Sequence, residues 1–527
     1  MRRLRQLAAH TPAGRQRYVD LLRALAIGMV VLGHWAVAAI GEDPGGRPTG
    51  RSALPELPWA YPLTWIAQVM PVFFLVGGYA NAASLTARRA AGGDATAWLL
   101  DRGARLLRPT TALLLVIAGG GALASLLGVG APLVRTVGWF ATIPLWFLAA
   151  YLIVVPLTPA MLALHRRFGL LVPSALAALV VAGDVGRALG PAELAVPNYV
   201  FGWLAVHQLG IAWRAADTRR HADEGHHANE GRHGDAGHAD EGHHADAGRH
   251  GARPGPHAAS GRGGVPPRPA GAEWRRWPLS RRAGAGALLG GLGATVLLTT
   301  FGPYPVSMLN VPGERLDNAA PPSLALLTLT TAQFGLILLL RDPAERWLRR
   351  SRPWQAVIAV NAVVLTVFLW HLSAAILLVG ALDAAGMLPT PPVGSAAWLA
   401  WRVPWVLMLT VVLAVLVAVF GPIEARTGRT GGGGGGGGDG GDGGGRPGRT
   451  AGTPAGGSAP AGPRWRATVR TALTAAGFAA VVYALVLNAQ TPKTAPEPLG
   501  VPTPALVAYL AGAGTLRLLR SGWARRG

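Results

Sequence analysis

Asp20-Leu-Leu-Arg23-Ala-Leu-Ala-Ile-Gly-Met-Val-Val-Leu-Gly-His34-Trp35 is the most informative stretch of the chain, because it places an acid, an arginine and a histidine inside an otherwise apolar helix. Titratable side chains inside an apolar span usually mark function. Arg23 and His34 are eleven residues apart, so a helix places them within roughly 20° of one face and about 16 Å apart along its axis. Two interpretations stay open: a functional pair, or an arginine reaching the membrane surface plus a hydrogen-bonded histidine.

The composition indicates a membrane protein with many spans. Of the 527 residues, 50% are hydrophobic and only 14% are charged. Stretches apolar enough to cross about 30 Å of hydrocarbon lie at 18–40, 62–85, 110–130, 145–164, 170–189, 198–215, 283–301, 322–340, 356–381, 398–421, 468–489 and 503–520. We therefore predict an all-α, polytopic membrane helix bundle with a ten-helix core plus two C-terminal helices.

The basic residues that give the chain its net charge of +22 are concentrated in alternate loops between the predicted spans. If the N-terminus is cytoplasmic and the loops alternate sides, about 40 of the 48 basic residues fall in cytoplasmic segments. This bias predicts a multi-pass protein of the plasma membrane with both termini in the cytoplasm. The partner that suits such a distribution is the lipid bilayer, not nucleic acid.

Two low-complexity segments interrupt the helices. Residues 216–281 are rich in His, Gly and Ala and repeat the octapeptide His-Ala-Asp-Glu-Gly-His-His-Ala at 221–228 and 238–245. We expect a disordered cytoplasmic loop, and transition-metal binding by its histidines stays an open alternative. The second segment is a glycine run at 431–445, interrupted by Asp439 and Asp442, which is typical of a flexible tether.

These features predict the domain organisation. A cytoplasmic N-terminal segment (1–17) precedes a ten-helix membrane domain (18–423), which the 216–281 loop interrupts; a Gly-rich linker (424–465) then leads to a C-terminal transmembrane hairpin with a basic tail (466–527). The chain has no cysteine, which excludes disulfides and thiolate metal ligands. We predict no metal site in the membrane domain.

Several motifs within 15–423 resemble those of the integral membrane acyltransferase family 3. Arg23, ten residues and His34 match the pattern of that family's first helix. The run Pro71-Val-Phe-Phe-Leu-Val-Gly-Gly-Tyr79 is similar to a family run ending in Ser-Gly-Phe or Ser-Gly-Tyr, although Gly77 replaces the serine. Further similar motifs are Arg105-Leu-Leu-Arg108-Pro109, Leu145-Trp146-Phe-Leu and Val367-Phe-Leu-Trp370-His371.

The resemblance implies a membrane O-acyltransferase. Its family moves acyl groups onto cell-envelope sugars and other hydroxylated acceptors, so we expect transfer of an acyl group, here acetyl, from acyl-coenzyme A to a glycan or small-molecule hydroxyl. His34 would act as general base or, as an alternative, carry the acyl group covalently. Arg23 would hold the donor or orient Asp20, and an ion pair between the two would make Asp20 structural.

The donor is expected at an arginine row on the cytoplasmic side. Arg102, Arg105 and Arg108 are spaced i, i+3 and i+6, so one helix face can present three guanidinium groups to the phosphates of acyl-coenzyme A. The other interpretation is a positively charged stop to the span. Acyl-coenzyme A would be a substrate, with no cofactor bound tightly.

The acceptor is expected to arrive from outside. The polar loop 302–318 carries Tyr304, Glu314 and Asp317, which can bind a sugar, although its prolines and glycines also fit a rigid lid. Trp146 is either a cavity residue or an interfacial anchor. His371 lies about as far from the cytoplasmic surface as His34, so similar depths allow the two to share a cavity, although the sequence alone does not show that they meet.

A transporter is the main rival interpretation. Six helices, a basic loop and six more helices fit a secondary transporter, in which a proton or substrate path would use Asp20, Arg23, His34, Asp184, Arg187, His207 and His371. Related halves are expected of such a transporter, yet the Arg23 to His34 spacing and the arginine row have no counterpart after residue 282. A scaffold that lost its activity is the third interpretation, on account of Gly77.

Overall fold

The computed structural model describes residues 16–42, 46, 48–237, 280–312, 316–429 and 464–521. Its helices are α2 (Arg17–Val37), α3 (Thr64–Ala67), α4 (Met70–Ala90), α5 (Ala95–Leu126), α6 (Ala131–Thr142), α7 (Leu145–Phe168), α8 (Leu171–Leu189), α9 (Asn198–Gly237), α10 (Arg281–Thr300), α11 (Leu324–Leu348), α12 (Ser351–Asn361), α13 (Val364–Ala384), α14 (Ala396–Arg429), α15 (Arg464–Gln490) and α16 (Thr503–Arg520). Three short 3-10 helices are η1 (Leu54–Glu56), η2 (Pro58–Leu63) and η3 (Ala192–Ala195).

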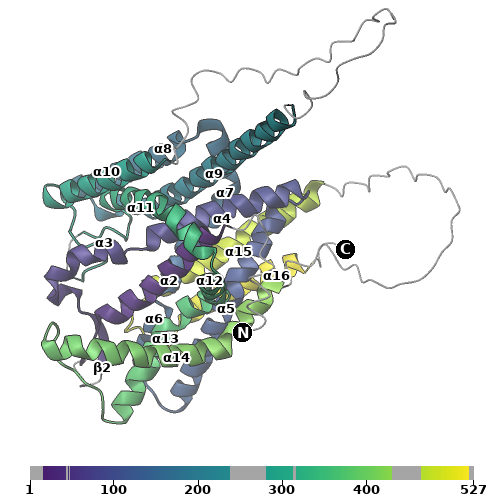
Figure 1. Cartoon of the computed structure of the whole chain (residues 1–527). Helices are drawn as coiled ribbons and strands as arrows, with labels where there is room; N and C mark the ends of the chain where they lie inside the picture. The colour runs from purple at the N-terminus through teal and green to yellow at the C-terminus, as the bar shows by residue number, and fades with distance from the viewer. Residues whose placement is uncertain are drawn as a thin grey trace, which may run out of the picture.

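The long helices form one bundle. Figure 1 shows them side by side, with the β-hairpin at one end. We call the end where α2 begins and α4 and α16 finish the arginine end, because Arg17, Arg88 and Arg520 lie there. The opposite end, which carries the hairpin β1 (Ala38–Glu42) and β2 (Pro48–Ser52), is the hairpin end.

The predicted fold class is confirmed. Each of the twelve predicted stretches is largely helical, although 18–40 ends in β1 and 62–85 and 356–381 each run from a shorter helix into a long one. Ten helical segments of the described residues are long and apolar enough to cross a membrane. The stretches 198–215 and 503–520 form α9 and α16, which are not among those ten. The protein is an all-α, multi-pass membrane protein.

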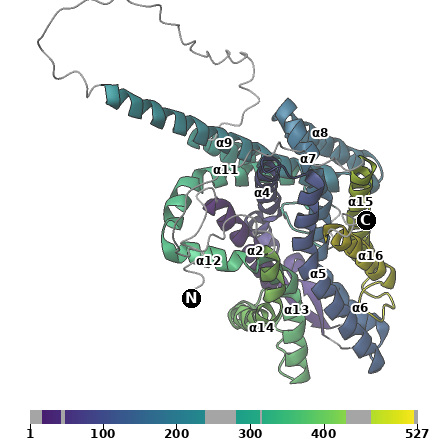
Figure 2. The same cartoon turned by 90° about the vertical axis from the view of Figure 1, so that its right-hand side faces the viewer.

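The structure differs from the predicted 216–281 loop in its first part. Helix α9 continues to Gly237, and Figure 2 shows it projecting away from the bundle. No proline interrupts the chain between Pro197 and Pro254, so nothing in this sequence forces an earlier end. Residues 238–279 and the glycine run 431–445 lie outside the described residues, as does the second octapeptide repeat.

Two glycines allow α4 and α9 to cross in backbone contact. A Cβ atom on Gly78 would lie 1.9 Å from the carbonyl oxygen of His207, and one on Gly210 would lie 2.0 Å from that of Leu75. Only glycine fits on both sides of such a crossing, as at other close contacts between membrane helices. The crossing fixes how α4 sits against α9.

The C-terminal hairpin of α15 and α16 packs on α5, α6 and α7. The buried Arg135 of α6 holds the connection between its two helices. Its guanidinium donates to the Asn488 side chain at 3.0 Å and to the carbonyl oxygens of Asn488, Thr491 and Gly500 at 2.8, 2.8 and 3.1 Å. A buried cation with this many acceptors ties the hairpin firmly to the bundle.

Candidate active site

A pair of histidines lies between α2 and α13. The Nδ1 atom of His34 is 3.0 Å from the Nε2 atom of His371, and the two rings stack with centroids 5.0 Å apart. His371 is fully buried, whereas His34 keeps some exposed surface. The structure therefore brings together the two histidines that the sequence placed at similar depths.

Hydrogen-bond partners fix the tautomers of this pair. Nδ1 of His371 lies 2.6 Å from the carbonyl oxygen of Phe368, which only accepts, so this nitrogen carries a hydrogen. In a neutral His371, Nε2 is then the acceptor, and Nδ1 of His34 must donate to it. The lone pair of a neutral His34 is left on Nε2, which is the arrangement of a general base held by a second residue.

Tryptophans hold the two helices in register around the pair. The indole of Trp35 donates to the carbonyl oxygen of His371 at 3.0 Å, and the indole of Trp405 in α14 donates to the carbonyl oxygen of Trp35 at 3.1 Å. Trp35 was not among the sequence candidates, although it directly follows His34. These bonds link α2, α13 and α14 at the level of the histidines.

Glu424 fixes the start of α13. Its carboxylate accepts from the backbone nitrogens of Leu365 and Thr366 at 3.1 and 2.7 Å, and from the Thr366 hydroxyl at 2.7 Å. An anion at a helix N-terminus satisfies unpaired backbone donors. No local pattern signals this contact, because Glu424 is 58 residues from Thr366.

Asp20 and Arg23 form an ion pair one turn into α2, with Nη1 of Arg23 3.3 Å from Oδ1 of Asp20. Asn361 at the end of α12 donates to the carbonyl oxygen of Asp20 at 2.9 Å. Arg23 lies eleven residues before His34, about 16 Å along the helix axis. The structure therefore places this pair nearer the arginine end, away from the histidines.

The arginine row on α5 divides between two environments. Arg102 is partly buried and donates to the Tyr151 hydroxyl at 3.4 Å, whereas Arg105 and Arg108 are exposed. Tyr151 also accepts from the Asn81 amide at 3.5 Å, and the same amide lies 3.1 Å from Nε2 of the buried His207. A polar line thus leads from the arginine row into the bundle.

Aromatic rings connect Arg102 with the histidines. Centroids are 6.2 Å apart between Tyr151 and Phe147, 5.3 Å between Phe147 and Phe368, and 6.0 Å between Phe368 and His371. Trp146 packs on the same core but has no ring contact with the histidines among the described residues. Its neighbour Phe147 is the residue that reaches toward His371.

The glycine that replaces the family serine is explained by Tyr151. A Cβ atom on Gly77 would lie 2.9 Å from Cε2 and 3.2 Å from the hydroxyl of Tyr151. The tyrosine ring therefore occupies the space that a serine side chain would need. The substitution changes the packing between α4 and α7 and leaves the histidine pair intact.

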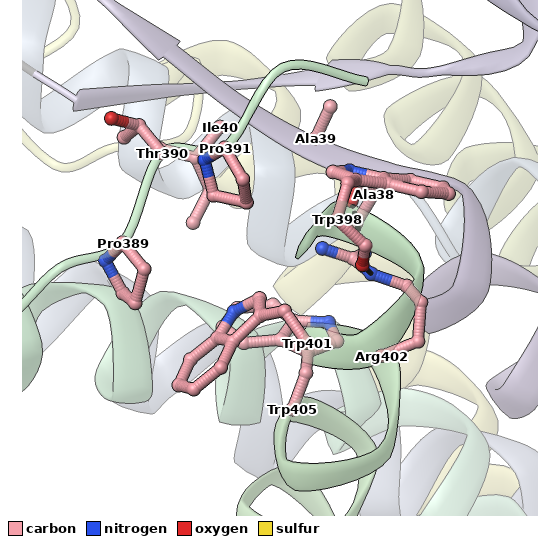
Figure 3. Close-up of a pocket in the computed structure, with 10 residues that line it drawn as sticks. All are labelled: Ala38, Ala39, Ile40, Pro389, Thr390, Pro391, Trp398, Trp401, Arg402 and Trp405. Atoms are coloured by element: carbon pink, nitrogen blue, oxygen red, sulfur yellow. Dashed lines mark hydrogen bonds between the residues drawn. The ribbon is translucent and has the colours of Figure 1, made fainter. Parts of the chain in front are cut away.

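A small tryptophan-lined pocket of about 10 Å³, which is room for about one water molecule, lies at the hairpin end (Figure 3). Its lining consists of Ala38, Ala39, Ile40, Pro389, Thr390, Pro391, Trp398, Trp401, Arg402 and Trp405. The guanidinium of Arg402 stacks on Trp398 at 4.2 Å and donates to the carbonyl oxygen of Ala38 at 2.7 Å. Indole faces beside a cation suit an amphipathic ligand with apolar and hydroxylated surfaces. The pocket must widen before a ligand larger than a water molecule can enter it.

This pocket is close to the histidine pair. Helix α2 finishes at Val37, three residues after His34, whereas α13 continues to Ala384, about 20 Å beyond His371. The strand β1 replaces α2 there and supplies one wall of the pocket. The opposite wall includes Trp405, whose indole bonds to Trp35.

The loop residues expected to bind the acceptor make hydrogen bonds within the protein. Tyr304 donates to Oδ2 of Asp184 at 2.8 Å. Asp317 accepts from Asn310 at 2.8 Å and from the backbone nitrogen of Ala319 at 2.7 Å. Glu314 lies outside the described residues. The Tyr304 bond fastens the loop to α8, and the Asp317 bonds hold the loop to itself, as in a rigid lid.

No group of three or more His, Asp or Glu side chains within the described ranges is arranged to hold a metal ion. Most of the histidine-rich segment falls outside those ranges, so metal binding by its histidines stays an open alternative.

Comparisons with known proteins identify the family. Residues 16–421 match the family model of acyltransferase family 3, described as an acyltransferase domain, and this covers most of the chain. Neither the curated proteins nor the solved structures contain a match. The transporter interpretation is not favoured by this finding. The chain belongs to acyltransferase family 3, and it is a membrane acyltransferase that transfers groups other than amino-acyl groups.

Proposed function

We propose that this acyltransferase takes an acyl group, expected to be acetyl, from acyl-coenzyme A and transfers it to a hydroxyl of a cell-envelope glycan or small-molecule acceptor. The observation that carries the proposal is the hydrogen bond between His34 and His371, because it leaves Nε2 of His34 as the proton acceptor. A neutral imidazole held in this way is suited to deprotonate a hydroxyl near pH 7.

The reaction follows from this geometry. Nε2 of His34 takes the proton of the acceptor hydroxyl, and the oxygen attacks the thioester carbonyl carbon. The carbon–sulfur bond breaks, and the leaving thiolate of coenzyme A recovers the proton from His34. Throughout the reaction, Nε2 of His371 accepts a hydrogen bond from Nδ1 of His34 and so keeps the His34 ring oriented. Covalent acylation of His34 is the alternative, and it needs the same free nitrogen.

The donor and the acceptor approach from opposite ends of the bundle in this proposal. Arg102 faces the Tyr151 hydroxyl, and the aromatic series from Tyr151 to Phe368 lines the way to His371, which supports donor entry from the arginine end. The tryptophan pocket beyond His34 supports acceptor entry from the hairpin end.

The arginine end would face the cytoplasm of a cell whose plasma membrane contains the protein. Arg17, Arg88, Arg349 and Arg520 lie toward this end, as the positive-inside rule requires of cytoplasmic loops. Acyl-coenzyme A is then available where the arginine row lies. Reporter fusions to each terminus would test the orientation, and an extracellular signal from either terminus would contradict it.

Transfer of labelled acetyl from acetyl-coenzyme A into membrane material tests the function. Vesicles with the wild-type protein should incorporate label, and His34→Ala should reduce the rate by about 10² to 10⁴-fold, the range expected for loss of a general base. His165→Ala, a buried histidine at the far end of α7, is the matched control and should keep most of the activity. Equal incorporation by wild type and His34→Ala would overturn the proposal.

A further inference from the structure

The C-terminal hairpin brings two more arginines to the donor side. Helix α16 lies outside the residues that match the family domain, yet it packs along α5. The Tyr509 hydroxyl donates to the carbonyl oxygen of Leu107 at 3.1 Å and lies 3.1 Å from the Thr111 hydroxyl. One end of α16 is thereby fixed beside the arginine row of α5.

The other end of α16 is fixed by an ion pair. Nε of Arg520 lies 3.0 Å from Oδ1 of Asp101, and Nη1 of Arg88 lies 3.1 Å from the second oxygen of the same carboxylate. Both oxygens of Asp101 are therefore already used. Arg520 is close enough to Arg105 and Arg108 to repel them, and Arg517 acts on Arg108 in the same way.

Three of these arginines have no direct partner among the described residues, although the Asp101 carboxylate attracts Arg105 from a distance. Within the described part of the chain, Arg105, Arg108 and Arg517 have no ion-pair or hydrogen-bond partner, and all three are exposed. Like charges held together destabilise a folded protein, and a bound polyanion relieves the repulsion. Because several guanidinium groups lie on two separate helices, the surface suits a ligand with several phosphate groups better than a ligand with a single phosphate.

We infer that Arg517 and Arg520 of α16 complete, with Arg105 and Arg108 of α5, a binding surface for the phosphate groups at the nucleotide end of the acyl donor. This inference rests on the proposed function. The row continues inward to Arg102 and Tyr151, so a donor whose phosphates rest on this surface can direct its acyl end into the bundle. The C-terminal hairpin of α15 and α16 thereby supplies substrate-binding residues that the family domain lacks.

Two sources can supply phosphate to this surface: the soluble donor and the headgroups of anionic lipids. A donor without the nucleotide separates them. Acetyl-pantetheine carries the thioester but no phosphate, so the surface should affect acetyl-coenzyme A alone. The measured quantity is the ratio of KM for acetyl-coenzyme A to KM for acetyl-pantetheine in neutral phosphatidylcholine vesicles.

R517Q/R520Q should raise this ratio about tenfold or more, since charged hydrogen bonds to phosphate are lost. R517Q alone should raise it in the same direction, and it leaves the Arg520–Asp101 pair in place. R466Q is the matched control, because Arg466 is an exposed arginine on α15 of the same hairpin. Its ratio should equal that of the wild type.

An unchanged ratio in R517Q/R520Q would overturn the inference. So would an effect seen only in vesicles containing phosphatidylglycerol, because it would assign the surface to lipid headgroups. Direct titration of the detergent-solubilised protein with coenzyme A separates this inference from the proposed function. If R517Q binds coenzyme A more weakly than the wild type does, the inference is supported. If the wild type also transfers no acetyl, the proposed function is contradicted while the inference stands.

Discussion

The indole nitrogen of Trp35 donates to the backbone carbonyl oxygen of His371 at 3.0 Å, so the residue that follows His34 binds the main chain of its partner. The pair is therefore held twice: once through the imidazoles and once through this indole. Such positioning matters because proton transfer depends on holding donor and acceptor within hydrogen-bond distance.

Trp35→Phe removes the indole donor and keeps an aromatic ring. We expect kcat for acetyl transfer to fall about fivefold, with little change in KM for the donor, because one bond of about 1 kcal/mol that aligns α2 with α13 is lost. Steady-state kinetics in vesicles measure this. Trp59→Phe, at an exposed tryptophan of η2, should behave as the wild type. A change in donor KM alone would contradict the prediction.

His371→Leu leaves Nδ1 of His34 without its acceptor. The His34 ring can then rotate and change tautomer, so kcat should fall by about 10²-fold. His371→Gln should retain more activity than His371→Leu, because its side-chain oxygen can accept the same hydrogen. Initial rates of the two variants at equal protein level test this order. Equal activity in both would show that His371 does not act through His34.

Trp401→Ala removes one face of the tryptophan pocket. If the acceptor binds there, its KM should rise about tenfold, the scale of one aromatic contact, while KM for the donor stays near the wild-type value. Trp347→Ala, at an exposed tryptophan near the arginine end, is the control. An unchanged acceptor KM in Trp401→Ala would exclude the pocket as the acceptor site.

Gly78→Ala places a methyl group where the backbone of α9 lies. A Cβ atom 1.9 Å from the carbonyl oxygen of His207 forces the helices apart, at a cost of roughly 3 kcal/mol. The apparent melting temperature in detergent should drop by several degrees. Gly286→Ala on α10 has nothing within 4 Å of its new Cβ and should leave the melting temperature unchanged or raise it. Similar values for both variants would contradict the close crossing.

Tyr304→Phe removes the hydroxyl that fastens the outer loop to Asp184. Burial, together with the Asp184 carboxylate, raises the pKa of Tyr304 above its usual value, so the phenol stays protonated and donates across the neutral and mildly alkaline range. We expect a loss of about 1 to 2 kcal/mol in stability, seen as a lower melting temperature, with acceptor KM within about twofold of wild type. A raised KM for the acceptor, with an unchanged melting temperature, would instead indicate that the loop binds the acceptor.

The sequence predicted the helices well because apolar length and arginine placement are local properties. All twelve predicted stretches are largely helical, and the arginine row on α5 is exposed at two of its three positions, Arg105 and Arg108. Local signals failed for the hairpin at 38–52 and for the extension of α9 to Gly237. Whether such short or polar segments form regular structure depends on packing and on helix propensity summed over many residues.

The sequence by itself determined the fold class, the residue types of the site and the family, since the membrane requires every span to satisfy its own backbone hydrogen bonds. The tertiary structure alone decided which side chains meet. It places His34 against His371, 337 positions away in the chain, and joins Trp405 to Trp35 by a hydrogen bond. It also places Arg517 near Arg108 of α5. Those contacts depend on how helices cross, and Gly78 and Gly210 set one such crossing by backbone contact that no local pattern specifies.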